Sequence, residues 1–222
     1  MRLVVLAIGA AFSLCAASAL AAPPQRSFNT AAFAGLASPD IPPDGNALLA
    51  YDLDGANGQV IHFTSCRQAA ETRQEAVRTD QFPLWKLLTL NCVAASKYAA
   101  SRAAQRSYFP AGLTRQVVAA FPADSVPDIG GGELQRRAGR TLERYEQRLR
   151  ITVNRDGTAQ ARTADADLGY TLIARADFDG DGLEDWLLRS QWSPRGARGS
   201  GADLVLLSRK KSRGRIVIAW RP

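Results

Sequence analysis

The sequence has few of the residues on which most enzyme chemistry depends. Its 222 residues include one histidine, one methionine and three cysteines. The histidine, His62, lies on an expected strand with no nucleophile motif near it, so we interpret it as a packed or surface residue. The G-x-S-x-G, P-loop and dinucleotide-binding patterns are absent. These absences argue against serine hydrolases and nucleotide-binding enzymes, whereas hydrolysis by carboxylates alone stays open.

The sequence also lacks the polar composition of disordered proteins and the length of a long repeat array. Hydrophobic residues make up 46% and charged residues 22% of the chain, which is typical of a folded protein. The length allows one full domain or two small ones.

The N-terminus has the pattern of an export signal. Arg2 precedes an apolar segment over residues 3–14, and small residues at alternate positions of 19–21 fit a processing site. We therefore expect a signal peptide over 1–21 and an exported protein, periplasmic or extracellular, without a membrane span after cleavage. An uncleaved anchor over 3–22 is the alternative, but this segment is alanine-rich and ends in the processing motif.

The remaining cysteines and charges follow from this expectation. Cys15 falls within the signal, and Leu14 before it argues against lipidation. Cys66 and Cys92 remain and predict one disulfide in an oxidising compartment. Without Arg2 the 28 basic residues become 27, against 21 acidic residues, which leaves a net charge of +6. Such a diffuse charge favours anionic surfaces but does not indicate nucleic-acid binding.

The first half of the mature chain begins without periodicity. Residues 22–45 are rich in proline and alanine and predict a tether or wrapping arm, ahead of one α+β domain over 46–222. Strand-like runs over 46–52 and 59–64 flank a glycine-containing loop and predict a hairpin. Asp52 and Asp54 resemble part of a calcium loop, but an alanine replaces the third ligand, so we interpret them as turn residues.

Two helices are expected over about residues 65–107. Ser65 and Gln68 have the spacing of a capping box, which predicts a helix over 66–78. A second helix is expected over 82–105. Its apolar stripe, spaced by three and four residues, consists of Leu84, Leu88, Cys92, Ala95 and Ala99.

The two cysteines fit one geometry in this region. Cys66 and Cys92 are equally distant from residue 79, where the turn between the expected helices lies. Two antiparallel helices folded at that turn would bring the cysteines level with each other. We therefore expect a disulfide that closes a helical hairpin.

The second half of the chain predicts sheet. Residues 133–147 form either a short helix or an irregular segment; a helix would align Arg136, Arg140, Arg144 and Arg148, as a solvated face or as a contact for an anionic surface. Six short strands follow over about 148–220, most simply as an antiparallel β-meander. The fold class is therefore α+β. The expected strands are 149–153, 158–163, 168–176, 186–192, 203–208 and 215–220.

One motif carries recognisable chemistry. Residues 177–185, which we call the acidic loop, read D-F-D-G-D-G-L-E-D. Carboxylates at loop positions 1, 3, 5 and 9 and a free backbone carbonyl at position 7 supply hard oxygen ligands around one centre, as Ca²⁺ prefers. The glycines permit the tight backbone path that this requires. The alternative is an acidic turn that holds no ion.

The setting distinguishes this motif from an EF-hand. An EF-hand needs a glutamate at position 12, where Leu188 lies, and helices on both sides. The loop and its strands instead resemble the calcium loops of FG-GAP and VCBS-type repeats. This resemblance implies a calcium ion and one ligand set: Asp177, Asp179, Asp181, the Leu183 carbonyl and Asp185. Only one copy is present, so a propeller and integrin-like binding are not implied.

A basic turn and the turn at 154–157 are both expected at the end of the meander where the acidic loop lies. The basic turn contains Arg209, Lys210, Lys211 and Arg213. We interpret it as a solvated hairpin tip that partly neutralises the acidic loop; the alternative is a docking point for an anionic partner.

These patterns together predict the function only in outline. The export signal and the C-terminal half resemble a group of uncharacterised bacterial exported proteins that carry a single such loop. We expect an exported calcium-binding, non-catalytic protein that recognises an anionic envelope component or a protein partner. The alternative is an exported hydrolase with a structural or catalytic calcium ion.

Overall fold

The computed structural model describes residues 26–128, 132–196 and 198–222. The expected signal peptide (1–21) and the first residues of the expected arm lie outside the described residues. No helix within the described ranges is both long and apolar enough to cross a membrane.

Helices precede most of the strands, and the expected α+β class is confirmed. The strands are β1 (Ser27–Phe28), β2 (Leu48–Asp54), β3 (Val60–Ser65), β4 (Arg150–Val153), β5 (Ala159–Arg162), β6 (Ala166–Ala176), β7 (Asp185–Pro194), β8 (Gly201–Ser208) and β9 (Val217–Trp220). The helices are α1 (Cys66–Glu71), α2 (Phe82–Ala100), α3 (Arg115–Ala119), α4 (Glu133–Arg137) and α5 (Leu142–Tyr145). The short 3-10 turns are η1 (Thr30–Ala32), η2 (Gln74–Ala76), η3 (Thr79–Gln81) and η4 (Ala123–Ser125).

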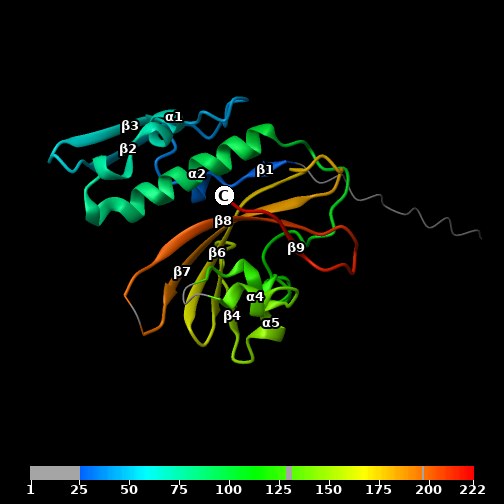
Figure 1. Ribbon diagram of the computed structural model, residues 1–222. Helices are drawn as coiled ribbons and strands as arrows, with labels where there is room; N and C mark the ends of the chain where they lie inside the picture. Colours follow the sequence, from blue (N-terminus) through cyan, green and yellow to red (C-terminus); the bar gives the residue numbers. More distant parts are fainter. Residues whose placement is uncertain (1–25, 129–131, 197) are drawn as a thin grey trace, which may run out of the picture.

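The main sheet contains the expected antiparallel meander. Strands β4 to β9 lie side by side in sequence order. On one edge of β6, β5 reaches Tyr170, and β1 pairs further along with Ala174 and Arg175 (Figure 1). The β4–β5 turn therefore stops short of the sheet end where we expected it. The expected arm thus contributes a strand that extends this edge.

Different parts of the chain cover the two faces of the main sheet (Figure 1). Helix α2 crosses one face, and the short helices α3 to α5 lie against the other. The cluster under α2 includes Leu90, Ala94, Ile173, Leu187, Leu204 and Leu206. The cluster on the other face includes Val118, Phe121, Leu142, Tyr170 and Trp186. The main sheet is therefore packed against other elements on both of its faces.

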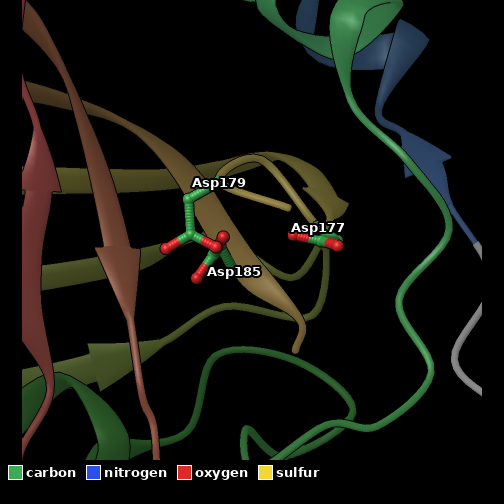
Figure 2. Close-up of side chains that lie close together, drawn as sticks. All are labelled: Asp177, Asp179 and Asp185. Atoms are coloured by element: carbon green, nitrogen blue, oxygen red, sulfur yellow. The ribbon is translucent and has the colours of Figure 1, made fainter. Parts of the chain in front are cut away.

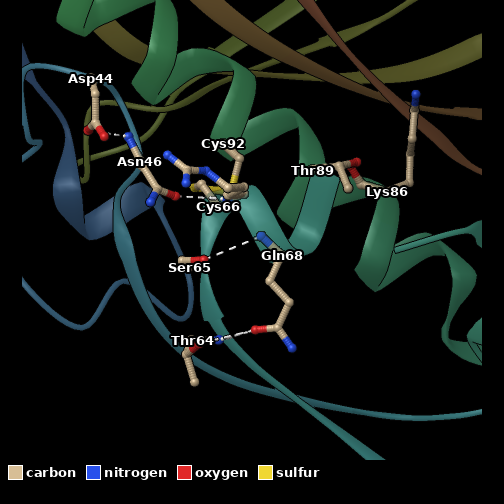
Figure 3. The surroundings of a disulfide bond; sticks show 10 residues. Asp44, Asn46, Thr64, Ser65, Cys66, Gln68, Lys86, Thr89 and Cys92 are labelled. Atoms are coloured by element: carbon tan, nitrogen blue, oxygen red, sulfur yellow. Dashed lines mark hydrogen bonds between the residues drawn. A yellow bond between two sulfur atoms is a disulfide. The ribbon is translucent and has the colours of Figure 1, made fainter. Parts of the chain in front are cut away.

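The expected disulfide between Cys66 and Cys92 is confirmed, with the two Cα atoms 5.2 Å apart (Figure 3). It joins the first turn of α1 to the middle of α2. The Ser65 hydroxyl caps α1 by accepting from the Gln68 N–H at 3.3 Å, as the capping-box spacing predicts. The Gln68 side chain, however, accepts from the Thr64 N–H rather than from Ser65.

The helical hairpin that we expected around this disulfide is not formed. Helix α1 ends at Glu71 instead of residue 78, and η2 and η3 follow it. The reason is a competing set of backbone hydrogen bonds: the Ala76 carbonyl accepts from Ala56, and the Arg78 N–H donates to Asp54. The chain is therefore extended at Val77, whose side chain is buried beside the β2–β3 hairpin.

Helix α2 also differs from its expected form. It ends at Ala100 rather than residue 105, because the Ser101 hydroxyl and N–H both donate to the Tyr98 carbonyl. Cys92 is buried as the apolar stripe predicts, but Leu84 in the first turn is 44% exposed. The first turn of α2 therefore exposes a leucine that the apolar stripe predicts to be buried.

The region 133–147 forms two short helices, α4 and α5, instead of one. Gly139 has φ +70° between them, a left-handed conformation that ends the helical path. The four arginines consequently do not form one stripe, and Arg137, which none of the expected stripe positions includes, is the buried arginine of this segment.

Removal of the disulfide is expected to destabilise the fold. Its cysteines are 26 residues apart, and closing a loop of about 27 residues contributes about 3 to 4 kcal/mol in the chain-entropy model. The Cys66→Ala/Cys92→Ala double variant should therefore lower Tm by about 6 to 16 °C for a protein of this size. Differential scanning calorimetry measures this change. Two free thiols at these positions in the unreduced exported protein would contradict the pairing.

Candidate metal centre

The acidic loop connects two paired strands of the main sheet. Strand β6 ends at Ala176, and β7 begins at Asp185, opposite Ala176 in register. The residues that follow α2, 101–106, lie along the loop, and we call them the strap segment. Arg102 exchanges two backbone hydrogen bonds with Asp177, both 2.9 Å, and the Gln105 N–H donates to the Gly182 carbonyl at 2.8 Å. The loop is therefore held near both of its ends by backbone bridges to the strap segment.

The aspartates shape the loop by accepting from its own backbone. Asp177 accepts from the Gly180 N–H at 2.7 Å through Oδ1 and from the Gly182 N–H at 2.9 Å through Oδ2. Both glycines have positive φ, +82° and +78°, a conformation in which other residues are strained. Asp181 accepts from the Leu183 N–H at 2.9 Å. These bonds fix the tight backbone path of the loop.

Three carboxylates of the loop come together. Asp177, Asp179 and Asp185 each offer an oxygen, and these atoms all lie within 4.8 Å of one another (Figure 2). Oxygens that bind one Ca²⁺ at about 2.3 to 2.6 Å can be at most about 5 Å apart, so the observed spacing suits three ligands of one ion. Asp177 and Asp185 are only 4% and 0% exposed. The cluster therefore places negative charge where water can screen little of it.

Asp185 is the least compensated carboxylate of this cluster. Its Oδ2 accepts from the Phe178 N–H at 3.1 Å, but its Oδ1 has no hydrogen-bond partner among the described residues. Burial raises the pKa of Asp185 to about 6; the charge of Asp179 adds to the rise, and Ser208, the Phe178 N–H and Lys210 oppose it. The Ser208 hydroxyl is close enough to act on this pKa but, like Oδ1, has no partner in hydrogen-bonding geometry. Asp185 thus needs a proton or a cation.

Lys210 of the basic turn reaches the exposed aspartates of the acidic loop. Its ammonium lies 2.6 Å from Asp179 Oδ2 and also forms an ion pair with Asp181. Burial opposes protonation of Lys210, but the two ion pairs outweigh it and raise its pKa. The expected neighbourhood of the acidic loop and the basic turn is therefore confirmed. Arg209 also has internal partners, the carbonyls of Gly214 and Tyr108.

The expected ligands Asp181 and Leu183 lie at the edge of this arrangement. Asp181 is not part of the three-carboxylate cluster and faces Lys210 instead. Leu183 lies opposite Arg106 in a parallel bridge made by the Gly182 carbonyl and the Glu184 N–H. Leu183 therefore keeps its own carbonyl outside that bridge. In the structure, the acidic cluster consists of three of the five expected ligands.

Glu184 is a buried acid of the loop that the sequence reasoning did not single out. Its carboxylate forms an ion pair with Arg175, with both oxygens 3.0 Å from Nη2, and accepts from Ser107 and from the Trp186 indole. Arg175 in turn donates to the Ala111 carbonyl. Glu184 is therefore fully paired and anchors the loop to the sheet. Its position directly before a buried apolar strand is the sequence signal that could have indicated a buried acid.

The histidine and the two aspartates of the β2–β3 hairpin lie in surface pairs. His62 contacts Asp52 through Nδ1 at 2.9 Å, and both side chains are exposed. Asp54 pairs with Arg78 at 2.7 Å and accepts from Gln81. Asp52 and Asp54 are therefore paired strand residues of β2 rather than the turn residues that we expected, and His62 is a surface residue.

The burial of Asp185 predicts a pH-dependent cost in the absence of a metal ion. Its pKa in the folded protein, about 6, lies above the ordinary 3.8, so ionisation destabilises the fold increasingly from about pH 4 to pH 7. With chelator at pH 7, Asp185→Asn should raise the free energy of unfolding by about 1 to 3 kcal/mol, because it removes the buried charge while the amide oxygen still accepts from the Phe178 N–H. The gain should vanish at pH 4. Denaturant unfolding at both pH values measures it; a pH-independent effect would contradict this origin, and Asp52→Asn is the control.

Comparison with protein-family models, curated proteins and solved structures gives no match to this chain. The resemblance of residues 177–185 to FG-GAP and VCBS-type loops therefore stays a prediction.

Proposed function

We propose that this chain is an exported protein that binds one calcium ion at residues 177–185 and recognises an anionic envelope component or a protein partner without catalysing a reaction. One observation carries the calcium site: the fully buried Asp185 has an unpartnered oxygen within the described structure and lies in a cluster with Asp177 and Asp179. A cation bound there would compensate the charge that burial makes costly.

The donor set favours calcium over other metal ions. All the candidate ligands are oxygens, which hard cations prefer, and neither histidine nor cysteine belongs to the cluster that would select zinc or copper. Magnesium demands a tight octahedral shell, whereas calcium accepts irregular shells of six to eight oxygens. Asp177, Asp179 and Asp185 would bind the ion, and Asp181 and the Leu183 carbonyl would complete its shell as in the FG-GAP resemblance.

The role proposed for the ion is structural. The loop supplies its ligands within nine residues and is paired to the strap segment, so an ion would hold the end of β6, the start of β7 and the end of α2 together. The disulfide between Cys66 and Cys92 supports export, because such bonds persist in oxidising compartments.

The alternative, an exported hydrolase, has less support. Hydrolysis by carboxylates requires a pair of acids across a cleft. A cleft of about 980 Å³ between the start of α2 and the main sheet is lined by a single carboxylate, Asp167, and this residue is paired with Arg162. This cleft therefore lacks the pair of acids that such hydrolysis needs.

Calcium is expected to stabilise the protein. An ion at a hundredfold excess over Kd adds about 2.7 kcal/mol to the free energy of unfolding, which corresponds to about 5 to 11 °C in Tm. Asp179→Ala should abolish this shift, whereas Asp52→Ala should keep it, and magnesium should substitute poorly. Thermal unfolding with calcium, magnesium and chelator measures these effects. An unchanged Tm in millimolar calcium would contradict the proposal.

Lys210 is expected to compete with the ion. Its ammonium pairs with Asp179 and Asp181, so calcium must displace a resident positive charge. Lys210→Gln should therefore tighten calcium binding by about tenfold, an electrostatic change of about 1.4 kcal/mol. Lys211→Gln is the matched control, because Lys211 is an exposed neighbour in the same turn. Calorimetric titration compares the variants; weaker binding by Lys210→Gln would show that the lysine supports the site.

A further inference from the structure

A cleft of about 980 Å³ opens between α2 and the main sheet, at the sheet end opposite to the acidic loop. We call it the α2 cleft. It exists because α2 packs on the sheet from about its middle onward, where Leu90 and Ala94 are buried. The first turns of α2 extend past this contact, over the starts of β6 and β8 and the end of β7 (Figure 1). A volume of this size is at the upper end of the range for small-molecule sites, about 300 to 1,000 Å³.

The two walls of the α2 cleft have different chemistry. On the side of α2, the lining includes Phe82, Leu84 and Leu87, and the exposure of Leu84 leaves apolar surface open to the cleft. On the side of the sheet, a cross-strand row of five partners forms the floor: Thr152, Gln160, Gly169, Gln191 and Ala202. Gly169 and Ala202 have little or no side chain, so the floor is recessed at these two positions. The cleft therefore suits a ligand with an apolar and a polar part.

A second row of the floor concentrates positive charge. Arg150 and Arg162 are directly opposite each other on β4 and β5, and Asp167 is opposite Arg162 on β6. Asp167 accepts from Arg162 at 2.7 Å, and Arg150 has no ion pair among the described residues. Like charges directly opposite in a sheet are destabilising, and Lys86 of α2 adds another cation to the lining. Three cations face one carboxylate, which calls for an anion between the arginines.

We propose that the α2 cleft binds an amphiphilic anion: an acyl chain or a similar apolar body under Phe82, Leu84 and Leu87, with its anionic headgroup held by Arg150 and Arg162. Guanidinium groups bind carboxylate and phosphate through paired, charge-assisted hydrogen bonds, which suits either kind of headgroup. The polar row beyond the arginines would contact the rest of a larger headgroup. This site shares no residue with the acidic loop and does not depend on the proposed ion.

The test is calorimetric titration of the whole protein with monomeric dodecanoate, in chelator because calcium precipitates this acid. We expect one dodecanoate per chain, binding at least tenfold weaker for the neutral dodecyl maltoside, and no heat with acetate. A parallel titration with monomeric lysophosphatidylglycerol distinguishes the source: tighter binding indicates a phospholipid, weaker binding a free fatty acid. Absence of heat with both anionic amphiphiles would overturn the proposal.

Matched variants locate the binding. Arg150→Gln and Arg162→Gln should each weaken dodecanoate binding at least tenfold, and Arg155→Gln, in the β4–β5 turn outside the cleft, should not. Leu84→Gln should weaken it as well, whereas Leu48→Gln, an equally apolar residue that is 58% exposed on β2, should not. All of these side chains are exposed, so the fold should persist, which circular dichroism checks. Full affinity in the Arg150→Gln/Arg162→Gln double variant would also overturn the proposal.

Discussion

Negative charge held at the end of the β6–β7 pair is the constraint that organises the surrounding structure. Two neighbouring buried acids meet this constraint differently. Glu184 is satisfied by Arg175, Ser107 and Trp186, so the protein itself neutralises it. Asp185 receives one backbone N–H and retains an oxygen without a partner in the described structure. Since a buried unpaired charge is costly, this contrast separates an anchoring acid from one suited to an external cation.

The ends of the main sheet carry different chemistry, and α2 is connected to both. Its first turns border the α2 cleft, and the strap segment that follows its last turn pairs with the acidic loop. The sites are separated by most of the length of β6: seven residue steps, about 23 Å, lie between Gly169 in the cleft lining and Ala176 before the loop. The disulfide fixes the middle of α2 to α1. One helix, held at its centre, thus spans from the proposed ligand site to the proposed ion site.

The sequence predicted those features that depend on local spacing. Alternating residues gave the meander, and the cysteine positions gave the disulfide, because both patterns are encoded within short segments. The helix expected to residue 78 failed because Val77 pairs with the distant Gly55, a contact that no local pattern reveals. The sequence also did not predict the α2 cleft, because the cleft depends on which part of α2 packs on the sheet. The basic turn was expected near the acidic loop, but the specific pairing of Lys210 with Asp179 and Asp181 required the structure.

The calcium site is the central claim, and its location can be measured directly. A crystal grown or soaked in millimolar calcium should show an anomalous difference peak among the carboxylates of Asp177, Asp179 and Asp185. The Lys210 ammonium should have moved away from Asp179, with which it pairs at 2.6 Å in the present structure. A crystal in which Lys210 keeps both ion pairs and no peak appears at the loop would contradict the account.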